Sequence, residues 1–457
     1  MRIYIFLILF FLCGKTLAQQ STDSTVVIDN IIISGNKRTR TDIILREMFL
    51  KKGDTISKSK LPEAVDISKH QIFNTTLFSE VTIHTAASVG NNISVIVMVK
   101  ERWYIFPVPY FRLVDRNFND WWVNRNHSLE RVDYGIKFYH NNLTGRNDKL
   151  TADVITGYSR QLSLRYNLPY INKKLTNGIN IGIVHTKQKE VTYATNDSNK
   201  QLLLKAIDGF PKTYTRADIT FTNRPNLFLR HNFKISYTSE SIDSFVAFVS
   251  PTYYSNHQTT LKYFDISYSL SYSKTNYNAY PTKGFSAVVG GFVRTFNQDN
   301  NFYQLNGTAM LATRFNHKWY MRNRVAATVK FPYNGAFINE PLFGYNPYQL
   351  RGLEYYVVDG QIGVMHKFTL GYNLLDFNLK VPIKNKYINK VPFKIYAKVY
   401  NDLGYCYKPN ATTLLNNKLM HTQGFGIDVL TAYDIVFKFE YSFNQLGNSG
   451  LFFGLRD

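Results

Sequence analysis

The chain has 457 residues, 16% of them aromatic, and a formal charge of +22. This length fits two or three ordinary domains, or one large barrel with a small domain. After the first 18 residues no segment reaches 18 consecutive apolar residues, which excludes a bundle of transmembrane helices. The positive charge suits lipid phosphates at a membrane edge or a solvated loop surface, and the sequence leaves both open.

The N-terminus has the pattern of a secretory signal. A charged Arg2 precedes an apolar run over residues 3–13, and Ala18 offers a small-residue cleavage site. We therefore expect residues 1–18 to be a signal peptide, which argues against nucleic acid as a partner. A lipoprotein attached through Cys13 is the alternative. After cleavage only Cys406 remains, so no internal disulfide is expected.

Residues 24–103 read as a compact α/β unit. The pattern predicts a strand over 26–34, a helix starting at Thr41 and a second helical stretch over 57–78. Two alternating strands follow, at 80–85 and 93–99. The candidate core residues of the two helices are Ile43, Ile44, Met48, Leu61, Val65, Ile67, Ile72 and Leu77.

From Tyr104 onward, segments of about ten residues alternate apolar and polar side chains. A closed transmembrane β-barrel requires this alternation, because its residues face lipid and lumen in turn. We count sixteen candidate strands, starting near residues 104, 131, 149, 160, 177, 212, 228, 260, 285, 301, 318, 361, 392, 421, 434 and 450.

The connections between these strands also alternate in length. Those after even strands are mostly short, whereas long ones follow odd strands near 114–130, 188–211, 241–258, 333–359 and 402–420. Short periplasmic turns and long external loops are typical of outer-membrane barrels. An aromatic-rich soluble β-sandwich is the alternative, but it gives no reason for this asymmetry.

Several short motifs support a family resemblance. Residues 31–39 and 77–81 resemble parts of a polypeptide-transport-associated (POTRA) domain. Residues 142–146, 168–170 and 280–284 resemble barrel turns, in the matching order. Together they make nearly all of the mature chain similar to the BamA/TamA-type outer-membrane superfamily, also called the bacterial surface antigen family.

The resemblance implies a mainly β fold in the bacterial outer membrane. One POTRA-like periplasmic domain, at 24–103, would precede a sixteen-stranded antiparallel transmembrane barrel at 104–457. Its turn residues would be Gly145, Pro169, Pro281, Lys283 and Gly284. Proline presets a turn dihedral, and glycine accepts a positive φ.

The sharpest motif lies in the long loop near 333–359. In the resembling family, an Arg-Gly loop tip enters the barrel and its arginine meets an aspartate on the wall. Arg351 and Gly352 match the tip, and Asp402 and Gly404 match the wall, although both residues flanking the tip are leucine. The alternative is an exposed arginine in a mobile loop, with Asp402 as a strand cap.

The last strand is short and rich in glycine, at Gly447, Gly450 and Gly454. Glycine weakens a strand, and in the resembling family the first and last strands form a lateral seam that can open. A terminal strand that simply frays gives the same pattern. The chain also departs from the usual terminal aromatic residue, since it ends in Leu455-Arg456-Asp457.

Enzyme motifs are missing from the sequence. It has no Gly-x-Ser-x-Gly, no His-Glu-x-x-His and no phosphate loop, and its ten histidines show no metal spacing. We predict no catalytic residue, no metal site and no cofactor. A lipid hydrolase with a Ser-His pair stays open, because such pairs are not local in sequence.

The resemblance implies a machine that inserts or translocates proteins. Its expected partners are unfolded outer-membrane or secreted clients, periplasmic chaperones or lipoproteins, and outer-membrane lipids; nucleic acid is not expected. Clients would add a strand to the sheet edge of the 24–103 domain. The alternative is an accessory or structural barrel, or a pore, without assembly activity.

Overall fold

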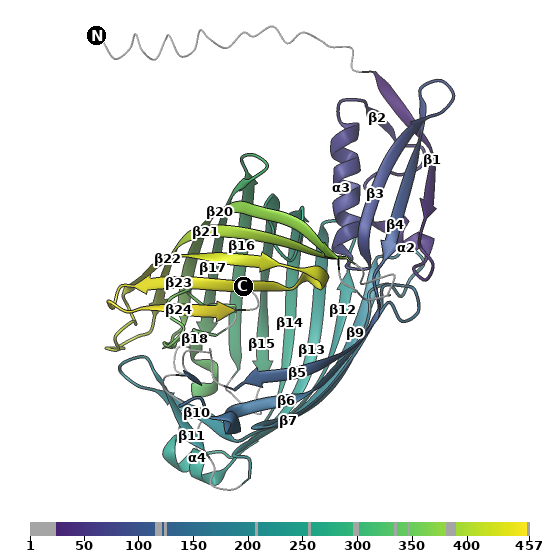
Figure 1. Cartoon of the computed structure of the whole chain (residues 1–457). Helices are drawn as coiled ribbons and strands as arrows, with labels where there is room; N and C mark the ends of the chain where they lie inside the picture. The colour runs from purple at the N-terminus through teal and green to yellow at the C-terminus, as the bar shows by residue number, and fades with distance from the viewer. Residues whose placement is uncertain are drawn as a thin grey trace, which may run out of the picture.

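The computed structural model describes residues 24–114, 121–122, 126–205, 209–254, 257–295, 301–332, 336–345, 347–380 and 390–454. The expected signal peptide at 1–18 lies outside the described residues. A small α/β unit stands on one end of a large curved sheet (Figure 1). Within the described residues, no helix combines the length and the apolar character needed to cross a membrane.

The N-terminal unit has four strands and two helices. Its elements are β1 (Thr25–Ser34), α2 (Thr41–Glu47), β2 (Thr55–Ser57), α3 (Leu61–Asn74), β3 (Phe78–Ala87) and β4 (Asn92–Glu101). The sheet order is β2-β1-β4-β3, with β1 parallel to β4. β3 therefore lies at one edge of this sheet, and its outer side has no strand partner among the described residues.

The core of the N-terminal unit lies between its helices and its sheet. Ile43, Ile44 and Met48 are buried as expected, and so are Ile72 and Leu77. Ile67 is only half-buried, because α3 begins at Leu61 and turns Ala64 and Ser68 toward the sheet. The predicted helix over 57–78 is too long at both ends, and the three-residue strand β2 was not predicted.

The large sheet confirms the sixteen-stranded antiparallel architecture. Neighbours in chain order pair throughout, from β5 to β24, once the strands of the long loops are set aside. The strands are β5 (Ile105–Leu113), β6 (Val132–Asn141), β7 (Lys149–Gly157), β8 (Ser159–Leu168), β9 (Asn177–Gln188), β12 (Lys212–Asn223), β13 (Leu229–Ile242), β14 (Thr260–Thr275), β15 (Gly284–Thr295), β16 (Phe302–Arg314), β17 (Trp319–Phe331), β20 (Ile362–Lys380), β21 (Lys390–Tyr407), β22 (Leu419–Leu430), β23 (Val436–Asn444) and β24 (Ser449–Gly454).

Side chains alternate between the two faces of this sheet. On β13, Phe233 and Ile235 are exposed on the outer face, whereas Ser236, Thr238 and Glu240 are buried on the inner face. The same apolar exposure recurs along the other strands, as at Leu162 and Leu164 on β8 or at Phe264 and Ile266 on β14. An apolar outer band around a polar interior is the pattern of a barrel in lipid.

The long loops gather at the end of the barrel opposite the N-terminal unit (Figure 1). They carry short elements that the sequence did not predict. These are the 3-10 turns Leu129–Arg131 and Phe337–Asn339, the hairpin β10 (Glu190–Thr195) with β11 (Gln201–Lys205), the helix α4 (Ser244–Val249), and the pair β18 (Pro341–Phe343) with β19 (Val358–Asp359). The 3-10 turn Ala432–Asp434 lies instead in the short connection between β22 and β23.

The sheet is not closed into a full cylinder. β5 and β24 are its two edges, and no pairing joins them in the described part of the chain (Figure 1). The described part of β24 has six residues, and β5 contains Pro107 and Pro109. Proline has no N–H, so it occurs on the free side of edge strands. Two prolines two residues apart therefore remove two donors from the side of β5 that would face β24.

Candidate functional site

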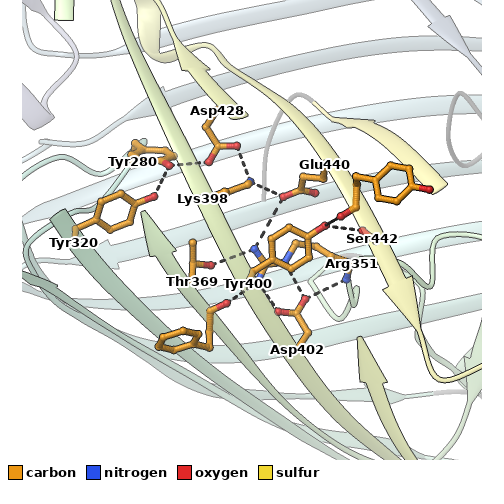
Figure 2. A network of polar contacts seen from close by, with 12 residues as sticks. Tyr280, Tyr320, Arg351, Thr369, Lys398, Tyr400, Asp402, Asp428, Glu440 and Ser442 are labelled. Carbon is orange, nitrogen blue, oxygen red and sulfur yellow. Dashed lines mark hydrogen bonds and ion pairs between the residues drawn. The ribbon is translucent and has the colours of Figure 1, made fainter. Parts of the chain in front are cut away.

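The loop between β17 and β20 enters the lumen and places Arg351 against Asp402 of β21 (Figure 2). Nε of Arg351 donates to Oδ2 of Asp402 at 2.9 Å, Nη2 pairs with Oδ1, and the backbone N–H of Arg351 also donates to Oδ2, at 3.1 Å. The side chains are 7% and 0% exposed. A bidentate pair of this kind is both strong and geometrically specific.

The remaining donors of Arg351 also have partners on the barrel wall. Nη1 donates to the hydroxyl of Thr369 at 3.1 Å, and Nη2 to the carbonyl of Phe368 at 3.1 Å, both on β20. The ring of Tyr400 lies 4.0 Å from the guanidinium carbon. Lysine has neither the planar fork nor the number of donors to replace these contacts.

The two leucines beside the Arg-Gly tip anchor the loop. Leu350 and Leu353 are 2% and 5% exposed, in an apolar cluster with Met365 and Met420. A Cβ on Gly404 would lie 2.6 Å from Cδ1 of Leu350, so this glycine makes room for the leucine. The two leucines depart from the family motif, and both pack into the apolar cluster on the barrel wall.

Gly352 is required by the path of the loop tip. Its φ is +84°, a left-handed conformation that side chains with a Cβ disfavour. A Cβ there would also lie 2.8 Å from Cβ of Ser442 on β23. The tip thus turns tightly while it touches the wall.

A second group of buried charges adjoins Arg351. Lys398 of β21 lies 2.6 Å from Oδ1 of Asp428 on β22, and it also pairs with Glu440 of β23. The hydroxyl of Tyr280 donates to Asp428 at 2.7 Å and also meets the hydroxyl of Tyr320. The result is one polar network across the lumen wall from β17 to β23 (Figure 2).

Sequence reasoning did not single out most of this network. Lys398 and Tyr400 could have been predicted, because they lie four and two residues before Asp402 on the same strand and so face the same side. Asp428 and Glu440 come from other strands, and their position beside Lys398 depends on strand register, which local patterns do not give.

The loop also reaches the last strand of the sheet. The carbonyl of Gly352 accepts from Nδ2 of Asn444 at 2.8 Å, and the hydroxyl of Tyr356 accepts from Asn448 at 2.8 Å. The ring of Tyr355 lies 5.8 Å from that of Phe452 on β24. The loop therefore bridges β20 and β21 to the edge of the sheet.

The predicted seam glycines all lie in or beside β24. Gly447 is in the preceding turn with φ +79°, and Gly450 and Gly454 pair with Ser442 and Lys438 of β23. A Cβ on Gly447 or on Gly454 would meet no atom within 4 Å. Steric crowding therefore does not explain why glycine occurs at 447 and 454.

The N-terminal unit is docked on the near rim, meaning the turns at 142–148, 169–176, 224–228, 276–283 and 431–435. Glu47, at the end of α2, accepts from Nη2 of Arg224 at 2.7 Å and from the hydroxyl of Tyr170 at 2.7 Å. Burial by itself would raise the pKa of Glu47. The Arg224 charge, with hydrogen bonds from Arg224 and Tyr170, outweighs burial, so the pKa of Glu47 lies below its ordinary value.

A second contact joins the N-terminal unit to the turn between β22 and β23. Nη1 of Arg102, just after β4, donates to Oδ2 of Asp434 at 3.1 Å, and the hydroxyl of Tyr277 donates to the same carboxylate at 2.6 Å. The Arg102 and Asp434 side chains are 9% and 14% exposed. Neither rim contact was predictable from local patterns in the sequence.

The predicted turn residues all lie on or beside this rim. The carbonyl of Gly145 accepts from the N–H of Arg40 at 3.0 Å. A Cβ on that glycine would lie 2.5 Å from the Arg38 carbonyl oxygen. Pro169 directly precedes Tyr170 and lines a cavity beneath the N-terminal unit.

The turn before β15 holds the other three. Oδ1 of Asn276 accepts from the backbone of Thr282 at 3.1 Å and of Lys283 at 3.0 Å. Gly284 has φ +117°. Pro281 directly follows Tyr280, whose hydroxyl belongs to the lumen network.

No group of three or more His, Cys, Asp or Glu side chains that could hold a metal ion occurs in the described ranges. Asp402, Asp428 and Glu440 of the lumen network pair instead with arginine and lysine.

Two family models match the chain. The POTRA model, described as surface antigen variable number repeat, matches residues 26–102, and the Omp85 superfamily domain matches residues 142–371. The outer membrane protein assembly factor BamA of Neorickettsia risticii (strain Illinois) is 30% identical over 148 residues. That match covers 32% of this chain but only 17% of the relative.

Two solved structures share the fold. BamA from Haemophilus ducreyi, lacking POTRA domains 1–3, has a TM-score of 0.50 and 16% identity, over 94% of this chain and 83% of that one. CdiB from Escherichia coli has a TM-score of 0.52 and 9% identity, over 96% and 91%. The Omp85 model alone spans half of the 457 residues, and with its POTRA domain and sixteen-stranded sheet the chain belongs to the Omp85 superfamily.

Proposed function

We propose that this chain inserts or translocates client proteins at the bacterial outer membrane. Residues 24–103 would form the periplasmic domain and 104–457 the membrane barrel. The family and its relatives, one of them named an assembly factor, support an outer-membrane barrel for protein assembly or secretion. The clients would be unfolded outer-membrane or secreted proteins, delivered with help from periplasmic chaperones or lipoproteins.

The observation that carries the proposal is the unpaired seam. In the described part of the chain, β5 and β24 each have one strand edge without a pairing partner. A client strand can add to such an edge by main-chain hydrogen bonds. In the N-terminal unit, β3 offers a second free edge, ten residues long, where an unfolded client would bind first.

In this account no residue acts covalently. Arg351 and Asp402 hold the loop, Gly352 and Gly404 give it room, and Gly447, Gly450 and Gly454 keep the seam weak. Free energy comes from burial of the client's own apolar surface and pairing of its strands, because an unpaired strand in lipid is costly.

Controlled depletion of the protein tests the proposal. The levels of other outer-membrane barrels should fall, or a secreted protein should accumulate in the periplasm, as measured by quantitative proteomics of separated membranes and medium. Re-expression of the whole chain should restore them. An unchanged outer-membrane and secreted proteome would favour the accessory barrel or pore instead. Release of fatty acid from lipids by the purified protein would favour a lipid hydrolase.

A further inference from the structure

Two adjoining cavities lie inside the barrel, directly beneath the N-terminal unit. Their volumes are about 600 Å³ and about 340 Å³, and both are lined by Asn74 and Thr76 of that unit and by Ser271, Ser273 and Asn278 of the barrel. We call the combined space the near-rim chamber. Each cavity is within the size of ordinary ligand sites.

The barrel wall of the chamber carries a group of short polar side chains. Ser271 and Ser273 on β14, Ser286 on β15 and Thr308 on β16 all line it. Hydroxyl and amide groups both donate and accept hydrogen bonds. Such groups can pair with the N–H and C=O groups of a polypeptide backbone.

The chamber also carries unneutralised positive charge. Arg230 on β13 and Arg324 on β17 line it, and in the described chain neither guanidinium makes a hydrogen bond or an ion pair. Lys149, Arg322 and Lys438 line it as well.

The carboxylates that line the chamber are already engaged. Glu47 is paired with Arg224, and Asp434 with Arg102. Neither is left to neutralise Arg230 or Arg324. Among the described residues, the chamber therefore presents at least two guanidinium groups without a hydrogen bond or an ion pair, at the mouth where a periplasmic chain would enter.

From this geometry we infer that the near-rim chamber binds acidic stretches of unfolded polypeptide. The inference rests on the proposed function, and it adds a preference for carboxylate-bearing segments. Arginine holds carboxylates through paired hydrogen bonds, while the serine and threonine wall receives the backbone of the same segment. A single small anion would fill only a fraction of the space and would leave this wall unused.

Peptide binding to the purified full-length chain tests the inference. The chain is placed in nanodiscs of zwitterionic phosphatidylcholine, so that the lipid adds no net charge. Fluorescence anisotropy then follows a labelled peptide of alternating glutamate and serine, and a matched peptide with lysine in place of glutamate. The acidic peptide should bind about tenfold more tightly, and salt should weaken its binding.

Variants locate the binding site. The double variant Arg230→Gln, Arg324→Gln should weaken binding of the acidic peptide about fivefold to tenfold, since each loses one charge pair. The control Lys173→Gln, Lys174→Gln removes two exposed charges from a near-rim turn outside the chamber lining. It should leave the affinity unchanged.

Three results would overturn the inference. They are equal affinity for the two peptides, equal loss in both double variants, and displacement of the acidic peptide by inorganic phosphate at the concentrations at which unlabelled peptide displaces it. Equal binding of both peptides through the β3 edge would contradict the preference for acidic segments but would not contradict the proposed function. Unchanged outer-membrane and secreted proteins after depletion of this chain would contradict the proposed function itself.

Discussion

Arg351 is the residue on which the lumen loop depends. Its guanidinium and backbone satisfy both oxygens of a fully buried carboxylate, a hydroxyl and a carbonyl, and its plane lies on the Tyr400 ring. Removing one partner of a buried pair leaves the other uncompensated, which costs about 3–5 kcal/mol, less where water enters. The loop position is thus set by a few contacts that can be tested singly.

Arg351→Ala and Asp402→Ala should have the same phenotype. Both should leave the barrel folded, release the loop to added protease and reduce client assembly by about tenfold or more, because each breaks the same pair. Arg351→Lys should fall between wild type and alanine. The control Arg40→Ala removes a half-exposed arginine and should change neither readout. Different phenotypes for the two alanine variants would contradict the pairing.

Gly404→Ala should displace the loop through Leu350. The new Cβ would meet Cδ1 of Leu350 at 2.6 Å, and overpacking of this kind costs about 1–3 kcal/mol. The double variant Gly404→Ala, Leu350→Ala should recover part of that loss, whereas Leu350→Ala alone should destabilise the loop. Thermal unfolding of the four proteins gives the coupling free energy. Additive effects would show that Leu350 does not contact this wall position.

At the scale of elements, β5 and β24 form the open seam of the barrel, and one docking surface holds the N-terminal unit on the near rim. β5 lacks two donors at Pro107 and Pro109, and the described part of β24 has six residues. We expect the missing donors to weaken pairing between β5 and β24. On the near rim, the N-terminal unit is held by the Glu47–Arg224 and Arg102–Asp434 pairs, so its orientation to the lumen depends on a few charges.

Pro107→Val with Pro109→Val should strengthen the seam. The variant restores two N–H donors, each worth about 1 kcal/mol when paired, and valine favours strands. Backbone amides of β24 should then exchange more slowly with deuterium, and client assembly should fall. Pro251→Val in an outer loop serves as the control. Unchanged exchange on β24 would mean that the prolines do not limit seam pairing.

Acid should loosen the docked N-terminal unit. The pKa of Glu47 is lowered in the folded state, so its contribution is complete above the unfolded value of about 4.3 and is lost as pH falls through the folded value. Spin labels at Lys58 and Lys283 should report a sharp distance at pH 7 that broadens as the pH falls through the lowered pKa of Glu47.

Variants assign this acid effect to one carboxylate. Glu47→Gln should give the broad distribution at both pH values, since Arg224 then loses its charged partner. Glu63→Gln, at an exposed carboxylate on α3, should behave as wild type. A wild-type distance that stays sharp down to the pH at which the barrel itself unfolds would contradict the role of Glu47.

At the scale of the whole molecule, much of the fold was predictable. Lipid and lumen impose a two-residue alternation on each strand, and the sixteen predicted starts fall within a few residues of those observed. The hairpin β10–β11 and helix α4 lie in outer loops, where neither constraint acts. The placement of Asp428, Glu440 and the near-rim pairs depends on strand register and on docking between distant segments, which no local pattern encodes.

Site-specific photocrosslinking in living cells tests the central claim most directly. A photoreactive amino acid at Leu451, exposed on β24, is compared with one at Ile219, exposed on β12 far from either edge. The account predicts crosslinks from position 451 to newly made outer-membrane or secreted proteins, and none to such clients from position 219. Equal client crosslinking from both positions, or none from 451 while clients are being assembled, would contradict it.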